Sequence, residues 1–223
     1  MNESLIAPLT GADRVRKRPA VMFGSDDLGG ALNAVGEIIK NSVMEGLQGY
    51  GKEIIITLND DNSVEISDSG RGIPVEYNDE EKMYDWEINF CELYARSRDN
   101  HEVKDFQYSL GIYGIGLCTV QYVSEYMDAE ILRDGFKYNL HFEKGKNIGG
   151  LQKAESKAEQ TGTKIKFRLD SEVFKNINIS EKTEHFKSFI QGCSLTNELY
   201  FTLCYPENNE IRQITYKKGN RCR

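Results

Sequence analysis

Strand-like segments dominate the second half of the chain, and their succession restricts the possible folds more than any other feature. The runs rich in β-branched and aromatic residues lie at 129–133, 137–142, 163–169, 199–205 and 210–216. A single helix is expected among them, at 181–191. Because most of these strands follow one another directly, they are expected to meander into one sheet. The pattern predicts an α+β protein and argues against alternating βαβ units.

Helices are expected mainly in the first half of the chain. They are predicted at 29–49, 84–97 and 114–126, with a polar, aperiodic loop at 98–109. The first two helices flank a pair of strands, 52–58 and 63–67, which are joined by the polar turn 59–62. The sequence contains no repeat, no low-complexity segment and no Pro-rich linker, so we expect one domain over residues 1–223.

Composition excludes several classes of protein. The chain has 223 residues and a formal net charge of −7, which argues against its being a main nucleic-acid surface. No apolar run approaches the ~20 residues of a membrane span, and the start lacks a secretory pattern. The five cysteines are scattered, so reduced thiols and a cytoplasmic location are expected. On charge alone, the basic cluster at 14–18 is interpreted as a solvated turn.

A polar stripe is predicted on the helix at 30–47. At 100° per residue its carboxylate and carboxamide side chains share one side: Asn33, Glu37, Asn41 and Glu45. Such groups coordinate a hard cation or orient a water molecule. An exposed surface helix is the alternative interpretation. A solvent face usually mixes in Lys and Arg, however, and here Lys40 is the helix's only basic residue.

The strand at 63–67 leads into an aspartate with unusual surroundings. Asp68 shares the parity of Val64 and Ile66, so its carboxylate is expected on the apolar face and must find a hydrogen-bond partner. The glycines that follow, Gly70 and Gly72, would let the backbone approach a ligand. A plain strand-to-loop turn capped by an aspartate remains the alternative.

A third feature is the glycine-spaced run at 109–117, which opens a predicted helix. A helix start offers unpaired N–H groups that suit phosphate. Alone it is a weak signal, since it fits neither a Rossmann fingerprint nor a Walker A motif.

Four segments in this order resemble the nucleotide motifs of the gyrase, histidine-kinase and mismatch-repair (GHKL) ATPase superfamily: Glu-Ile-Ile-Lys-Asn (37–41), Asp-Ser-Gly-Arg-Gly-Ile-Pro (68–74), Gly-Ile-Tyr-Gly-Ile-Gly (111–116) and Thr-Gly-Thr (161–163). Within it, the chain looks most like the ATPase domain of type IIA topoisomerase B subunits, gyrase B and ParE. Residues 16–24 resemble that branch's Arg-Lys-Arg-Pro-x-Met-Tyr-Ile-Gly segment. The resemblance extends from about Thr10 to Tyr216.

The resemblance implies a two-layer α/β sandwich of the GHKL (Bergerat) type, with a mixed, mostly antiparallel sheet and helices on one face. It implies an N-terminal arm at 1–20 and an ATP lid at 98–113. By position, Glu37 would be the general base, Asn41 would bind Mg²⁺, and Asp68 would accept the adenine amino group's hydrogen bond. Thr163 would support Asp68 through water.

Further ATP-binding positions follow from the same resemblance. Ile66, Ile73, Pro74 and Leu117 would wall the adenine pocket, and Arg133 would lie at its mouth. The remaining positions implied are Glu45, Arg71, Gly72, Arg98, Gly111, Ile112, Tyr113, Gly114, Ile115 and Gly116.

The chain departs from the family pattern in the magnesium helix and in the lid, where Arg96-Ser97 and Leu110-Gly111 replace the family's paired glycines. Lys40 and Met44 replace two aspartates of the magnesium helix, and Asn33 replaces a histidine four residues before the base.

ATP-driven clamp closure by dimerisation is the leading function. It would be coupled, through domains outside this chain, to a gyrase A or ParC-like breakage subunit and DNA, and the pocket would accept coumarin-type inhibitors. The alternative is a divergent regulatory module that binds nucleotide and hydrolyses little or none of it. A third hypothesis, a sensor kinase that transfers phosphate to histidine, has weak support.

Overall fold

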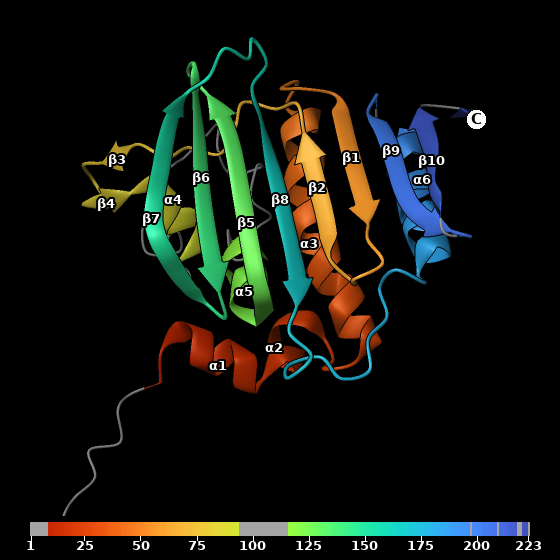
Figure 1. Cartoon of the computed structure of the whole chain (residues 1–223), viewed down its shortest axis with the longest axis horizontal. Helices are drawn as coiled ribbons and strands as arrows, with labels where there is room; N and C mark the ends of the chain where they lie inside the picture. Colours follow the sequence, from red (N-terminus) through yellow and green to blue (C-terminus); the bar gives the residue numbers. More distant parts are fainter. Residues whose placement is uncertain (1–8, 94–115, 197, 209, 218–219, 223) are drawn as a thin grey trace, which may run out of the picture.

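A computed structural model describes residues 9–93, 116–196, 198–208, 210–217 and 220–222 of the chain (Figure 1). One sheet of nine strands runs through it in the order β11-β10-β9-β1-β2-β8-β5-β6-β7. All neighbouring strands in this sheet are antiparallel except β1 and β9, which are parallel. The predicted α+β class with a mixed, mostly antiparallel sheet is confirmed.

The strands of this sheet are β1 (Glu53–Leu58), β2 (Val64–Asp68), β5 (Ser124–Arg133), β6 (Phe136–Glu143), β7 (Lys146–Glu155), β8 (Gly162–Leu169), β9 (Tyr200–Glu207), β10 (Glu210–Lys217) and β11 (Asn220–Cys222). A separate hairpin consists of β3 (Tyr77–Asn78) and β4 (Met83–Tyr84). The helices are α1 (Gly11–Lys17), α2 (Pro19–Phe23), α3 (Leu28–Leu47), α4 (Asp85–Phe90), α5 (Gly116–Val123) and α6 (Thr183–Thr196).

The helices form a layer on one face of the sheet. In Figure 1, α3, α5 and α6 lie behind the strands, and α1 and α2 run along the lower edge. The long helix α3 turns its apolar side to β1 and β2, and Val35 and Ile39 are fully buried in the core that also contains Ile66. Burying this apolar stripe between the two layers is the main source of stability for such an arrangement. The pocket described below opens in the helical layer.

The fourth helix is shorter than predicted. A helix was expected over 84–97, but α4 ends at Phe90, and residues 94–97 lie outside the described part of the chain. Phe90 is fully buried and stacks on Phe142. The carbonyl of Cys91 accepts a hydrogen bond from the hydroxyl of Tyr122. A side chain therefore satisfies this carbonyl, which a continued helix would have used.

The prediction of a helix over 114–126 was wrong at its end. Helix α5 stops at Val123, and β5 begins at once with Ser124. The hydroxyl of Ser124 donates to the carbonyl of Val120 at 2.7 Å, which satisfies an orphan group of the last turn. The chain then extends, because Ser124 pairs with β8 and residues 126–128 pair with both β6 and β8.

Strand β7 was missed. It contains Gly149 and Gly150 and lies at the edge of the sheet, where most of its side chains are half-buried or exposed. An edge strand that buries so little lacks the hydrophobic alternation by which strands are predicted.

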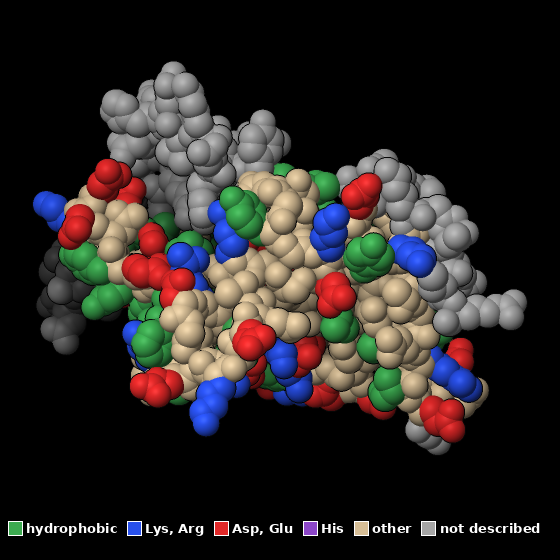
Figure 2. Space-filling model, turned by 90° about the horizontal axis from the view of Figure 1, so that it is seen from above, with side chains coloured by type: hydrophobic (Ala, Val, Ile, Leu, Met, Phe, Trp, Pro, Cys, Tyr) green, Lys and Arg blue, Asp and Glu red, His purple; other side chains and the backbone are tan. Residues whose placement is uncertain are grey.

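The surface carries mixed charge. Seen from above, Lys and Arg side chains are interspersed with Asp and Glu, and neither sign forms a continuous patch on this face (Figure 2). Among the described residues, no helix is both long and apolar enough to cross a membrane.

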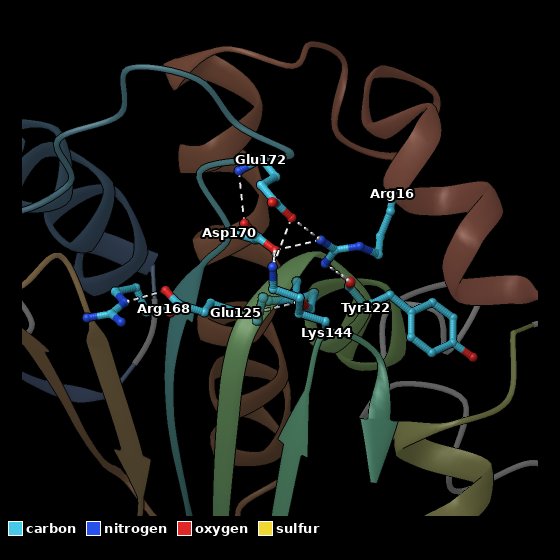
Figure 3. A network of polar contacts seen from close by, with 9 residues as sticks. Arg16, Tyr122, Glu125, Lys144, Arg168, Asp170 and Glu172 are labelled. Atoms are coloured by element: carbon cyan, nitrogen blue, oxygen red, sulfur yellow. Dashed lines mark hydrogen bonds and ion pairs between the residues drawn. The ribbon is translucent and has the colours of Figure 1, made fainter.

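The interpretation of the 14–18 cluster as a solvated turn was wrong for Arg16. Its guanidinium donates to the carbonyl of Tyr122 at 2.9 Å and to the carboxylate of Asp170 at 2.5 Å (Figure 3). Lys144 lies 3.4 Å from the same carboxylate. Arg16 thus connects α1 to the end of α5 and to the segment after β8.

Candidate functional site

A pocket of about 150 Å³ opens between α3, β2, β8 and the segment 70–74. It is lined by both predicted and unpredicted residues: Ile38, Asn41, Ser42, Glu45, Ile66, Asp68, Arg71, Gly72, Ile73, Pro74, Asn89, Leu117, Arg133, Thr163 and Ile165. Apolar side chains and polar groups converge on it, a combination that is found in sites for small organic ligands.

Asp68 supplies a half-buried carboxylate to this pocket. It shares a face with Val64 and Ile66, as its parity predicts, and that face is turned to α3. Its Oδ2 accepts from the hydroxyl of Ser42 at 2.7 Å, and its Oδ1 accepts from the N–H of Gly70 at 3.0 Å. Burial nevertheless raises the pKa of Asp68, because desolvation penalises the charge more than these hydrogen bonds stabilise it.

The loop after β2 is anchored to α3 by an ion pair. The guanidinium of Arg71 makes two contacts with the carboxylate of Glu45, at 2.8 and 2.9 Å, and the N–H of Arg71 donates to the same group at 3.0 Å. The guanidinium also lies 3.7 Å from the centre of the Tyr50 ring. This bidentate pair fixes one wall of the pocket relative to the helix.

Two threonines of the Thr-Gly-Thr segment tie the same loop to the start of β8. The hydroxyl of Thr161 donates to the carbonyl of Gly70 at 2.6 Å, and the hydroxyl of Thr163 accepts from the N–H of Ile73 at 3.1 Å. Gly72 adopts φ +78°, and a Cβ there would lie 2.7 Å from the carbonyl oxygen of Leu132. The positive φ and the close approach of the Leu132 backbone therefore require a glycine here, whether or not a ligand is bound.

Arg133 lies at the mouth of the pocket. Its Nε is 2.9 Å from the carboxylate of Glu76, and its Nη1 donates to the carbonyl of Gly72 at 3.1 Å. Asp134 provides a second carboxylate at 3.0 Å. The guanidinium is therefore held at the rim by groups on both sides.

Glu37 lies beside the pocket and does not line it. A methyl group placed on Gly116, the first residue of α5, would lie 2.9 Å from Oε2 of Glu37. The other oxygen, Oε1, accepts from the ammonium group of Lys40 at 2.6 Å. One turn along α3, Asn41 faces the pocket, whereas Asn33 lies away from it and donates to the carbonyl of Phe23 at 2.9 Å. The predicted polar stripe thus spans three different environments.

Sequence reasoning missed four residues of the lining: Ile38, Ser42, Asn89 and Ile165. Helical spacing places Ile38 and Ser42 on one side of α3, and strand parity places Ile165 on the same face as Thr163, so periodicity could have found these three. Asn89 is a buried asparagine between the buried residues Ile88 and Phe90 of α4, and no local pattern indicates which cavity it lines. Six predicted positions lie outside the described residues: Arg98, Gly111, Ile112, Tyr113, Gly114 and Ile115.

Comparison with known proteins identifies a family and several relatives. Residues 27–173 match the family described as histidine kinase-, DNA gyrase B- and HSP90-like ATPase. The chain is 36% identical over 213 residues to the B subunit of DNA topoisomerase 4 from Francisella tularensis subsp. holarctica, covering 95% of this chain and 32% of that protein. It is 37% identical over 218 residues to the corresponding protein of Staphylococcus aureus, covering 96% and 32%.

A solved structure is also similar. It is the 43K ATPase domain of Thermus thermophilus gyrase B in complex with an aminocoumarin, with a TM-score of 0.78 and 26% identity. The match covers 94% of this chain and 52% of that one. The chain spans about a third of the length of the curated relatives it matches. From the family match over residues 27–173, the chain belongs to the histidine kinase-, DNA gyrase B- and HSP90-like ATPases.

Proposed function

We propose that this chain is the ATP-binding and ATP-hydrolysing domain of a type IIA DNA topoisomerase, contributed by its B subunit. In that role ATP would close a dimeric clamp for DNA strand passage. The proposal is supported by the topoisomerase 4 relatives, by the gyrase B neighbour and by the pocket itself. Contacts with DNA and with a gyrase A or ParC-like breakage subunit would come from protein outside this chain. Such an enzyme would work in the cytoplasm.

Asp68 is the observation that carries the proposal. A carboxylate at the base of an apolar pocket is an acceptor that can take a hydrogen bond from the exocyclic amino group of adenine. Ser42 and the N–H of Gly70 hold it in place. Ile66, Pro74 and Leu117 supply apolar surface for the faces of a flat base. The two oxygens of this carboxylate have further lone pairs beside those that accept from Ser42 and Gly70, so a ligand that brings a donor would be favoured here.

Asn41 is suited to a magnesium ion that arrives with the nucleotide. Among the described residues, no cluster of three or more His, Cys, Asp or Glu side chains could hold a metal by itself. Nucleotide-bound Mg²⁺ takes most of its ligands from phosphate and water, so one carboxamide oxygen from the protein suffices. When bound, the ion would neutralise charge that develops on the phosphates. Glu37, one turn away beside α5, would accept the proton of the attacking water.

A regulatory module that binds nucleotide with little turnover is the second candidate. The ion pair between Glu37 and Lys40 favours it, because this contact must be broken before Oε1 of Glu37 can contact a water molecule. Asn33, hydrogen-bonded to the carbonyl of Phe23, adds no side chain that could assist proton transfer at Glu37.

Asp68→Asn tests the proposed adenine contact. The substitution offers an amide donor where an acceptor is needed, so the affinity for ATP should fall by about 1–3 kcal/mol, which is roughly 5- to 150-fold. Isothermal titration calorimetry with a non-hydrolysable ATP analogue and Mg²⁺ measures this directly.

Asp61→Asn is the matched control, because Asp61 also accepts from a serine hydroxyl but lies in the turn between β1 and β2. Its affinity for the analogue should equal that of the parent. If Asp68→Asn binds the analogue as tightly as the parent does, the pocket has been assigned to the wrong ligand.

A further inference from the structure

The ion pair between Lys40 and Glu37 is partly exposed and is expected to contribute little to the stability of the fold. The Nζ of Lys40 lies 2.6 Å from Oε1 of Glu37, and the two side chains are 56% and 34% exposed. Exposed pairs spaced i,i+3 on a helix contribute little to stability. We therefore look for its effect on the chemistry of the Glu37 carboxylate.

One oxygen of Glu37 is engaged in this arrangement, and the other lies against the start of α5. Oε1 accepts a hydrogen bond from the ammonium group of Lys40, and a methyl group added to Gly116 would come within 2.9 Å of Oε2. The start of α5 also presents the positive end of a helix to this carboxylate. A water molecule approaching the side of the pocket near Asn41 and Leu117 therefore meets a carboxylate that is already engaged.

We propose that Lys40 is a brake on hydrolysis: its ammonium group holds Glu37 in an ion pair and so limits the rate at which this carboxylate can accept a proton from water. The inference rests on the proposed function, in which Glu37 is the general base. Lys40 is thus a positioning residue that acts through Glu37. Its effect falls on the rate of the chemical step and leaves the adenine end of the pocket, at Asp68, unchanged.

Lys40→Met tests the brake, because it removes the charge and keeps an unbranched side chain of similar length. The turnover number of the 223-residue chain with MgATP should rise about two- to fivefold, the factor that corresponds to losing one exposed ion pair. KM for ATP should stay at the parent's value. Lys40→Arg can keep the ion pair and should have the parent's turnover number. Lys40→Gln removes the charge and should raise the turnover number as Lys40→Met does.

The matched control is Lys187→Met. Lys187 and Glu184 form another i,i+3 pair at 2.6 Å, but on α6, outside the pocket lining. Its loss should leave turnover unchanged, which excludes an effect of net charge. A fall in turnover with a raised KM in Lys40→Met would mean that Lys40 binds phosphate, and the brake would be abandoned. The proposal would also be overturned if Lys40→Met had the same turnover as the parent, or if neither protein hydrolysed ATP.

Glu37→Gln separates this inference from the proposed function. If Glu37 is the base, Glu37→Gln should lower turnover by about 10²–10⁴-fold, and adding Lys40→Met to it should give no increase. Turnover at the parent's rate in Glu37→Gln would refute the catalytic role of Glu37, and the brake with it. Collapse in Glu37→Gln without acceleration in Lys40→Met would leave the base in place and refute only the brake.

Discussion

At the scale of single residues, Asp68 combines a place in the candidate pocket with a cost in stability. Its half-buried carboxylate lies against α3, and desolvation raises its pKa above the ordinary value of 3.8. The folded protein therefore holds a proton at Asp68 more readily than the unfolded chain does. The contribution of Asp68 to stability is fully present below the ordinary pKa and is lost as the pH rises through the raised, folded-state pKa.

This sign leads to a prediction for Asp68→Asn, which cannot ionise. Its free energy of unfolding, relative to that of the parent, should increase as the pH is raised from about 4 to about 7. Urea unfolding of both proteins across this range measures the difference. The amide can still accept from the N–H of Gly70 and donate to Ser42, so the variant should remain folded. A difference that is constant or shrinks with rising pH would contradict the prediction.

At the scale of elements, Arg16 connects parts of the chain that are far apart in sequence. It extends from α1 to Asp170 after β8, and it also donates to the carbonyl of Tyr122 at the end of α5 (Figure 3). Lys144, after β6, lies near the same carboxylate. Burial alone would raise the pKa of Asp170, but the hydrogen bond from Arg16 and the charges of Arg16 and Lys144 lower it below the ordinary value.

Arg16→Met should therefore destabilise the protein by about 2 kcal/mol at neutral pH, because it leaves an almost fully buried carboxylate with weaker compensation. The pKa of Asp170 is lowered, so this contribution is present above its ordinary value of 3.8 and is lost as the pH falls through the folded-state pKa. The deficit should shrink in acid. The measurement is the urea midpoint at several pH values.

Two further variants make the assignment specific. Combining Arg16→Met with Asp170→Asn removes the uncompensated charge and should recover part of the lost stability. Lys52→Met breaks an ion pair with Glu198 in which both side chains are more than half exposed, so it should cost less than about 0.5 kcal/mol. Equal losses in Arg16→Met and Lys52→Met would show that the buried network contributes nothing of its own.

At the scale of the whole molecule, the pocket is lined by residues of both the sheet and the helical layer, so it exists only in the folded protein. A ligand of this pocket would therefore bind the folded state and not the unfolded chain. Such a ligand raises the melting temperature by mass action. The gyrase B neighbour was solved with an aminocoumarin, and we expect the same class of compound to bind this pocket near Asp68, Thr163 and Arg133. At about 100 times its Kd it should raise Tm by roughly 5–10 °C.

Differential scanning fluorimetry with an aminocoumarin measures this shift, and titration with the ATP analogue should reduce the binding of the compound. Asp68→Asn should show a much smaller shift, whereas Lys187→Met should match the parent. A saturating aminocoumarin that leaves the parent's Tm unchanged would argue against a gyrase-like pocket.

Local periodicity was sufficient to predict the parts of this protein whose pattern repeats within a few residues. The apolar side of α3, the antiparallel pair β1 and β2, and the inward direction of Asp68 all follow from spacings of 3.6 and 2. The ordered motifs indicated the family before any fold was known. Helix ends were less predictable, since α4 and α5 stop where a hydroxyl group takes over a backbone carbonyl.

Only the tertiary structure decided which groups meet across long stretches of sequence. The hydroxyl of Ser42 reaches Asp68, the guanidinium of Arg16 reaches Asp170, and Asn89 joins the pocket wall. Desolvation is likewise a property of the assembled fold, so the raised pKa of Asp68 has no local signature. Composition and spacing describe a residue's own element, whereas burial and partners depend on what the other elements bring against it.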